Sequence, residues 1–242
     1  MAPECDVVLC GLGEDLSDTA LLNAIDYVFT YAESVGKPAV VNLSIGDHIG
    51  AHDGTSEICR AMDALSGDGR IIVAAVGNEG DVLMHFSTQF ANVGSSVEQK
   101  AVVLTDYDFG GGFYESLIDI WGKNDTSFTF QYVVVDGNGK ILARSKKQQP
   151  GSDGSCRFDM SSHTTFKNYY TGEGTAYFGV DGNNDKYNIF LDIQAESTGG
   201  DNDWRLGLLF WGPDGVELNG WDADGYTDFV KWDNNDFISG DT

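Results

Sequence analysis

Residues 97–242 consist of short strand-like runs separated by turns, a pattern that few folds can accommodate. No long apolar stripe at the spacing of a helix occurs there. About eight antiparallel strands in roughly 140 residues fit a β-sandwich, and a jelly roll is the form we prefer. The expected strands are Ala101–Tyr107, Phe113–Gly122, Ser127–Val135, Ile141–Lys146, Gly174–Asp181, Tyr187–Ala195, Trp204–Trp211 and Asp228–Trp232.

Residues 1–80 follow another pattern, in which apolar runs alternate with helices. We expect a first helix that is capped by Ser17 and ended by Gly36, and a second helix over residues 56–66. The expected strands are Cys5–Leu12, Ala39–Ile45 and Arg70–Val76. Continuous apolar strands joined through helices predict a parallel sheet that is covered on both faces.

The two patterns together predict the fold class and the domains. The fold class is α/β, a partial parallel sheet with helices, followed by an all-β sandwich of the jelly-roll type. We expect one domain over residues 1–96 and a second over 97–242, with a joint at Gly94-Ser95-Ser96.

The composition is strongly acidic, with 38 acidic and 14 basic residues and a net charge of -24. A polyanion is repelled by such a chain, so we expect no nucleic-acid partner. No apolar stretch has the roughly 18 residues of a membrane span. The four cysteines form no CxxC pair, so no metal site is expected from them. Cys5, Cys10 and Cys59 lie in apolar or helical patterns, which favours buried free thiols.

Two motifs in the first half resemble those of subtilisin-like serine peptidases. Val40–Gly46 (VVNLSIG) looks like the strand that flanks the substrate in that family, and Val73–Gly80 (VAAVGNEG) looks like its oxyanion-loop motif. Their order and the helix between them also fit. A jelly-roll insert after the asparagine motif resembles a bacterial subgroup that includes the Csp-type germination proteases, and Ile118–Gly122 looks like one of its strands.

The resemblance implies roles for individual residues. Asn78 would be the side-chain donor of the oxyanion hole, and its alternative is a plain turn after a strand. Ser44, Ile45 and Gly46 would pair with extended substrate, and their alternative is an ordinary strand end. The small residues Ala74, Ala75 and Gly77 would let the substrate backbone approach closely.

The family's catalytic Asp, His and Ser motifs are not found in this chain. We therefore expect an internal fragment of a serine endopeptidase that is inactive as given, with a peptide or protein substrate in the intact protein. The alternative is a non-catalytic module that binds carbohydrate or protein on a degenerate scaffold of the same kind. By family resemblance the parent protein would be secreted or in the cell envelope. Bare strand edges lead us to expect homo-oligomers.

His52-Asp53-Gly54-Thr55-Ser56 contains the residue types of a triad within one short loop. Such close neighbours rarely converge as a working triad requires, so we expect Asp53 or Thr55 to cap the following helix. His48 and His85 flank the two motifs, and each could lie near substrate or be an ordinary surface histidine.

No cofactor is expected, and calcium is the one alternative. The acidic turns 181–185 and 222–228 resemble parts of calcium loops, but the closing glutamate of an EF-hand is missing from both. Acidic turns are also common in any acidic β-protein.

The chain of 242 residues should not react with a fluorophosphonate probe, because the family's catalytic Asp, His and Ser motifs are not found in it. Mass spectrometry of the probe-treated chain measures this. Stoichiometric labelling of Ser56, or of any other serine, would show that the expectation is wrong.

Overall fold

The computed structural model describes residues 4–13, 17–80, 82–90, 92–93, 96–97, 100–106, 113–181, 185–199, 204–223, 227–233 and 236–239. The chain divides into two compact units. The first unit contains residues 1–46 and 51–77, and the second contains residues 47–50 and 78–242. The chain therefore leaves the first unit twice, after Gly46 and after Gly77.

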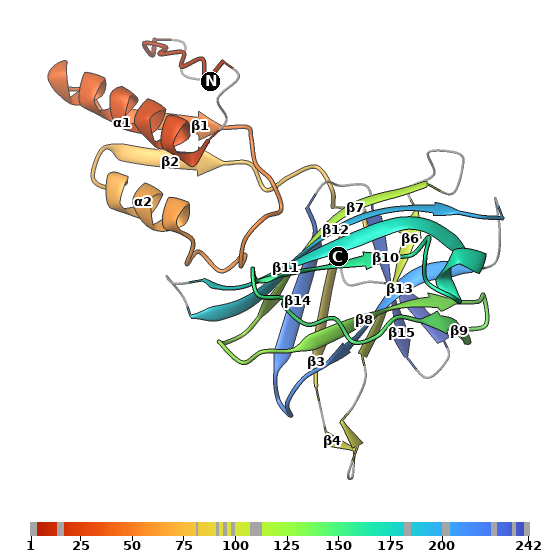
Figure 1. The fold of residues 1–242 in the computed structure, drawn as a ribbon. Coiled ribbons are helices and arrows are strands. Elements are labelled where there is room, and N and C mark those ends of the chain that lie inside the picture. Colours follow the sequence, from red (N-terminus) through yellow and green to blue (C-terminus); the bar gives the residue numbers. More distant parts are fainter. Residues whose placement is uncertain are drawn as a thin grey trace. The chain divides into compact units, whose positions relative to one another are not determined.

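The described residues of the first unit form two helices and one pair of parallel strands (Figure 1). Strand β1 pairs with β2 from Ala39↔Arg70 to Leu43↔Ala74. The elements are α1 (Asp18–Ser34), β1 (Ala39–Leu43), α2 (Glu57–Leu65) and β2 (Arg70–Ala74).

Local signals account for the ends of α1. Ser17 caps its N-terminus by accepting a hydrogen bond from the backbone N–H of Ala20, as expected from the sequence. Gly36 follows the last turn with a φ of 65°, a left-handed conformation that glycine adopts without strain. The helix buries Ile25 and Phe29 against Leu43 of β1, which is the small core of this unit.

The fold class predicted from the sequence is wrong. The chain is mostly β, and the described residues contain no parallel core of the subtilisin kind, since parallel pairing is confined to β1 and β2. Residues 5–12 form no strand, and a groove of about 520 Å³ lies between them, α1 and β1. The sheet is also not covered on both faces, because Val40 is 63% and Ile71 is 53% exposed.

The predicted burial of Cys5 and Cys10 is wrong for the same reason, although the thiols are free as expected. Cys5 and Cys10 are free and exposed, because the segment that carries them is not a buried strand. Cys59 is also free and is half-buried on α2.

In the second unit, the described residues form two six-stranded sheets (Figure 1). One has the order β10-β11-β12-β7-β14-β3, and the other has the order β16-β15-β6-β13-β8-β9. All pairings within them are antiparallel. A separate short pair joins β4 (Asn92–Val93) to β5 (Ser96–Val97). The strands of the two large sheets are β3 (His85–Gln89), β6 (Lys100–Asp106), β7 (Phe113–Gly122), β8 (Thr129–Val135), β9 (Ile141–Arg144), β10 (Ser155–Asp159), β11 (Tyr170–Asp181), β12 (Lys186–Ser197), β13 (Arg205–Trp211), β14 (Glu217–Asp222), β15 (Thr227–Asp233) and β16 (Asp236–Ser239).

One apolar core is shared by the two sheets. Ile118 and Ile120 of β7 belong to the same buried cluster as Phe130 of β8 and Phe210 of β13. Successive side chains of a strand point to opposite faces, so Asp119 of β7 lies on the face away from this core. The core thereby determines the face on which Asp119 lies.

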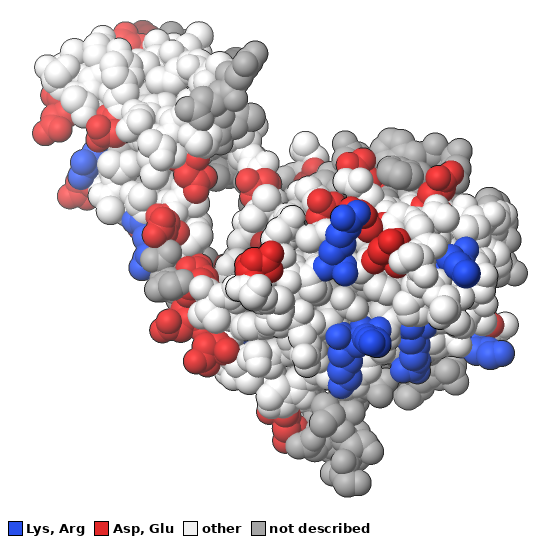
Figure 2. Space-filling view, in the orientation of Figure 1, with Lys and Arg blue, Asp and Glu red and all other residues white. Residues whose placement is uncertain are grey.

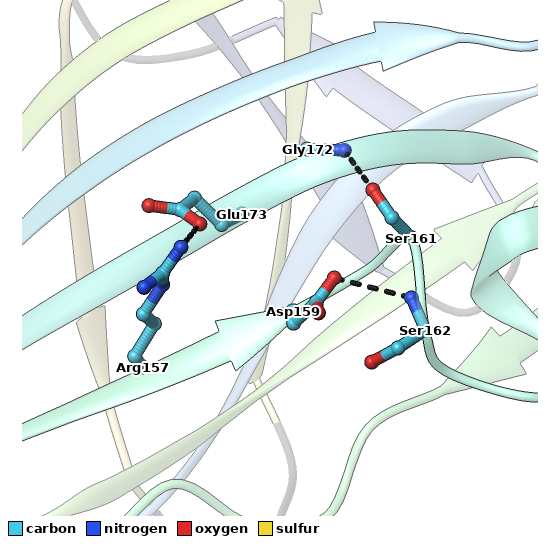
Figure 3. A network of polar contacts seen from close by, with 6 residues as sticks. All are labelled: Arg157, Asp159, Ser161, Ser162, Gly172 and Glu173. Carbon is cyan, nitrogen blue, oxygen red and sulfur yellow. Dashed lines mark hydrogen bonds and ion pairs between the residues drawn. The ribbon is translucent and has the colours of Figure 1, made fainter.

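Polar contacts fasten β10 to β11 at one end of the sandwich (Figure 3). The guanidinium of Arg157 pairs with the carboxylate of Glu173 across the two strands. Beyond β10, the backbone N–H of Gly172 donates to Ser161 Oγ at 2.8 Å. Asp159 Oδ1 accepts the backbone N–H of Ser162, and hydrogen bonds from Ser162 lower the pKa of Asp159.

Strands β3, β10, β14 and β16 were not predicted from the sequence. Strand β14 contains Gly220 and ends at an aspartate, which hides it from a search for β-branched runs. The expected joint at Gly94 and Ser95 lies outside the described residues. The domain boundary expected after residue 96 marks where the sandwich would be inserted into a subtilisin-like domain, and it stays a prediction.

Replacing Gly220 with alanine should destabilise the sandwich by about 1–3 kcal/mol, because the added methyl group would overlap the buried ring of Phe86. Urea unfolding followed by tryptophan fluorescence measures the change.

Gly179→Ala on β11 is the matched control, since a methyl group there meets no atom within 4 Å. Equal midpoints for the two variants would contradict the packing argument.

Candidate functional site

The carboxyl ends of β1 and β2 bring together the two segments that the sequence analysis selected. Leu43 lies opposite Ala74 in the parallel register, and the backbone N–H of Ala75 donates to Leu43 O at 2.9 Å. Ser44–Gly46 and Ala75–Gly77 therefore leave the same end of the pair. Residues at the carboxyl ends of neighbouring parallel strands are well placed to contact a common ligand.

The predicted substrate-binding residues all lie at the surface. Ser44, Ile45 and Gly46 are exposed, and so are Ala74, Ala75 and Gly77. The side chain of Asn42 donates a hydrogen bond to Ser44 Oγ at 3.1 Å. The side chains are thus open to solvent, and their role in binding substrate stays a prediction.

Asn78 is exposed and directly follows Gly77. Gly77 has a φ of 98°, which any residue with a side chain would adopt only under strain. This turn ends the run of β2 and begins the second unit at Asn78. The backbone N–H of Asn78 donates to Glu79 Oε2 at 2.7 Å.

The carboxylate of Glu79 also faces His48, which lies in the segment 47–50 of the second unit. His48 Nε2 lies 3.6 Å from Glu79 Oε2, and both side chains are part-exposed. The hydrogen bond from the Asn78 backbone, and to a lesser degree His48, lowers the pKa of Glu79. His48 lies beside the first motif in the sequence, but this pairing joins residues 31 positions apart and was not predicted.

The loop with the residue types of a triad is a helix cap. Ser56 Oγ accepts the backbone N–H of Cys59 at 3.3 Å, so Ser56 itself caps α2, and not Asp53 or Thr55 as expected. Asp53 Oδ1 accepts hydrogen bonds from the backbone and the hydroxyl of Thr55. These contacts give the loop a structural role.

His85, the histidine after the second motif, belongs to the sandwich. Its ring stacks on Trp221 with the centroids 4.8 Å apart, and its Nε2 lies 3.2 Å from Asn219 Oδ1. His85 therefore helps to hold β3 against β14.

Among the described residues, no cluster of three or more His, Cys, Asp or Glu side chains could hold a metal ion. The two acidic turns considered for calcium lie partly outside those residues, so calcium there stays untested. No helix in the described parts of the chain has the length and apolar character to cross a membrane.

Charge is unevenly distributed over the sandwich. Figure 2 shows lysines and arginines gathered over β8 and β9, whereas acidic side chains are spread over both units. Lys140, Arg144, Lys146 and Lys147 in this region are exposed, and Lys147 lies over the ring of Trp211.

Comparison with solved structures shows which proteins share this fold. No family model and no curated protein sequence matches the chain. The chain is similar in structure to the CspB protease of Clostridium perfringens, with a TM-score of 0.60 and 15% sequence identity. The similarity covers 90% of this chain and 43% of that protein. At this identity the match shows a shared fold, and the chain spans less than half the length of that neighbour.

The carboxyl group of Glu79 should titrate below its ordinary pKa of 4.5, because the Asn78 N–H and His48 both favour the charged form. As the pH falls through that lowered pKa, the hydrogen bond from Asn78 weakens. Carbon-13 NMR of the glutamate carboxyl groups measures the midpoint, and the Asn78 amide resonance should follow it.

His48→Gln should raise the midpoint only in part, since the Asn78 backbone is the larger cause. A midpoint at or above 4.5 in the unsubstituted protein would refute the arrangement.

Proposed function

We propose that this chain is part of a subtilisin-like serine endopeptidase and supplies the asparagine of its oxyanion hole. The observation that carries the proposal is the parallel register of β1 and β2. It brings Ser44–Gly46 and Ala75–Gly77 out of the same end of the pair, with Asn78 next in the chain. The shared fold with a CspB protease supports a protease-related scaffold.

In the proposed reaction, Asn78 acts on the charge that develops during acyl transfer. Attack on a peptide carbonyl converts its oxygen into an oxyanion, and a carboxamide N–H directed at that oxygen stabilises the transition state. The exposed side chain of Asn78 is available for this role. Its backbone N–H is already used by Glu79, which leaves the carboxamide as the donor.

The substrate would bind as an added strand along Ser44–Gly46. Main-chain hydrogen bonds of this kind give affinity with little demand on the substrate's sequence. Ala74, Ala75 and Gly77 have small side chains or none, so that a substrate backbone could come close. Ile45 and Val76 are large apolar side chains exposed at this end of the strand pair, and we assign Ile45 to contact a substrate side chain.

The proposal assigns the nucleophile and its base to other segments of the full-length protein. A Ser-His-Asp triad is needed to generate the nucleophile, and Ser56 is used as a helix cap. The 242 residues by themselves would then bind substrate weakly and not cleave it. The sandwich would be an insert within the catalytic domain.

Asn78→Ala in the full-length protein should lower kcat by about 10²–10³-fold with little change in KM, because it removes a contact made in the transition state. This magnitude is the one known for the oxyanion asparagine of subtilisin itself. Steady-state kinetics on a fluorogenic peptide measure both constants.

Asn138→Ala in the β8–β9 turn is the control and should leave both constants unchanged, since that side chain is exposed on the sandwich. Equal kcat values for the two variants would remove Asn78 from the mechanism. A full-length protein that never cleaves peptides would favour the non-catalytic binding module.

A further inference from the structure

We propose that Asp119 of the sandwich positions Asn78 through a relay of three further residues, Gly50, His48 and Glu79. The relay is a chain of contacts within the second unit. It runs from the outer face of β7 to the backbone of the candidate oxyanion donor. The proposal rests on the function proposed above, and it names positioning residues for that site.

The relay begins at a buried carboxylate. Asp119 is 2% exposed although it lies on the outer face of its sheet. In the strand register it lies between Trp221 of β14 and Phe190 of β12. Burying a carboxylate is costly unless it is hydrogen-bonded, so a buried one indicates that its partners are held firmly.

Both oxygens of Asp119 accept short hydrogen bonds. Asn188 of β12 donates its side-chain N–H to Oδ1 at 2.6 Å and thereby fixes the carboxylate on the sheet. The backbone N–H of Gly50 donates to Oδ2 at 2.6 Å. Hydrogen bonds to a charged acceptor are about twice as strong as neutral ones. Asp119 therefore ties the segment 47–50 to the sandwich.

The segment 47–50 is shaped for this contact. Gly50 has a φ of 116°, which only glycine adopts without strain. Asp47 Oδ1 accepts the backbone N–H of Ile49 at 3.0 Å, which forms a tight turn around His48. With Gly50 held by Asp119 and the turn closed by Asp47, the backbone of His48 has little freedom.

His48 connects the segment 47–50 to Glu79, the residue that directly follows Asn78. Its Nε2 lies 3.6 Å from Glu79 Oε2, the same oxygen that accepts the Asn78 backbone N–H at 2.7 Å. The relay thus consists of three side-chain contacts, and the backbone through Ile49 joins Gly50 to His48. Because Gly77 has no side chain to restrict its backbone, fixing the backbone of Asn78 also limits where its carboxamide can point.

The chain after Asn78 is anchored in the same unit. The backbone N–H of Asp222 donates to Met84 O at 2.9 Å, and β3 then pairs with β14. The chain is therefore fixed to the sandwich again at Met84, a few residues after Asn78.

The test measures hydrogen exchange at Gly50 and Asn78 together with peptidase kinetics in the full-length protein. Asp119→Ala should speed amide exchange at both residues by about tenfold or more, since each loses a charge-assisted hydrogen bond or its support. It should also lower kcat by roughly 10- to 100-fold, the range that a small misplacement of a reacting group can cost, with a smaller effect on KM.

Four further variants separate the relay from general stability. His48→Asn should speed exchange at Asn78 and leave Gly50 protected, because it interrupts the relay after Gly50. In the Asp119→Ala/His48→Asn double variant the effects on kcat should be non-additive, close to those of Asp119→Ala alone.

Asp119→Asn should retain most of the amide protection and most of the kcat of the unsubstituted protein, since its amide oxygen can still accept from Gly50. Asp192→Ala, a carboxylate on β12 that does not contact the loop, is the matched control.

The outcomes distinguish the two proposals. Faster exchange at Asn78 in Asp119→Ala, but not in Asp192→Ala, supports the relay. Unchanged exchange at Asn78 alongside lost protection at Gly50, or additive effects in the double variant, would overturn it. If Asp119→Ala does not fold, the His48→Asn result decides. If the unsubstituted protein cleaves no peptide, the proposed function fails while the exchange data still decide the relay.

Discussion

The apolar interior between the two antiparallel sheets is the constraint on which the other features depend. Side chains alternate along a strand, so packing Ile118 and Ile120 into that interior forces Asp119 onto the opposite face. There it accepts the Gly50 N–H and holds the segment 47–50. The hydrophobic effect thus determines the direction of a carboxylate, and the carboxylate determines the path of a loop.

The first unit has much less burial to rely on. Its core is centred on Ile25, Phe29 and Leu43, whereas Val40 and Val73 remain largely exposed on β1 and β2. A two-stranded sheet is marginal without further cover, and parallel strands are usually covered on both faces. The first unit does fix the register of β1 against β2. The pairing of Leu43 with Ala74 sets which residues follow the two strands at the same end of the sheet.

Elements with local signals could be predicted from the sequence, and elements that depend on distant partners could not. The cap at Ser17 and the strand Phe113–Gly122 are as expected, since each is encoded by its own residues. The run Cys5–Leu12 is as apolar as a strand but forms none, and it lines a groove together with α1 and β1. Strand β14 was missed because Gly220, unfavourable in an isolated strand, makes room for the ring of Phe86.

The candidate site divides in the same way. Asn78 and Ser44–Gly46 could be selected because their motifs are contiguous and resemble those of a known family. The contacts that hold them involve backbone N–H groups of Gly50 and Asn78, which every residue except proline possesses and which therefore leave no trace in the sequence. A motif can identify the group that does the chemistry. The rigidity of that group depends on long-range hydrogen bonds, and these become visible only once the chain is folded.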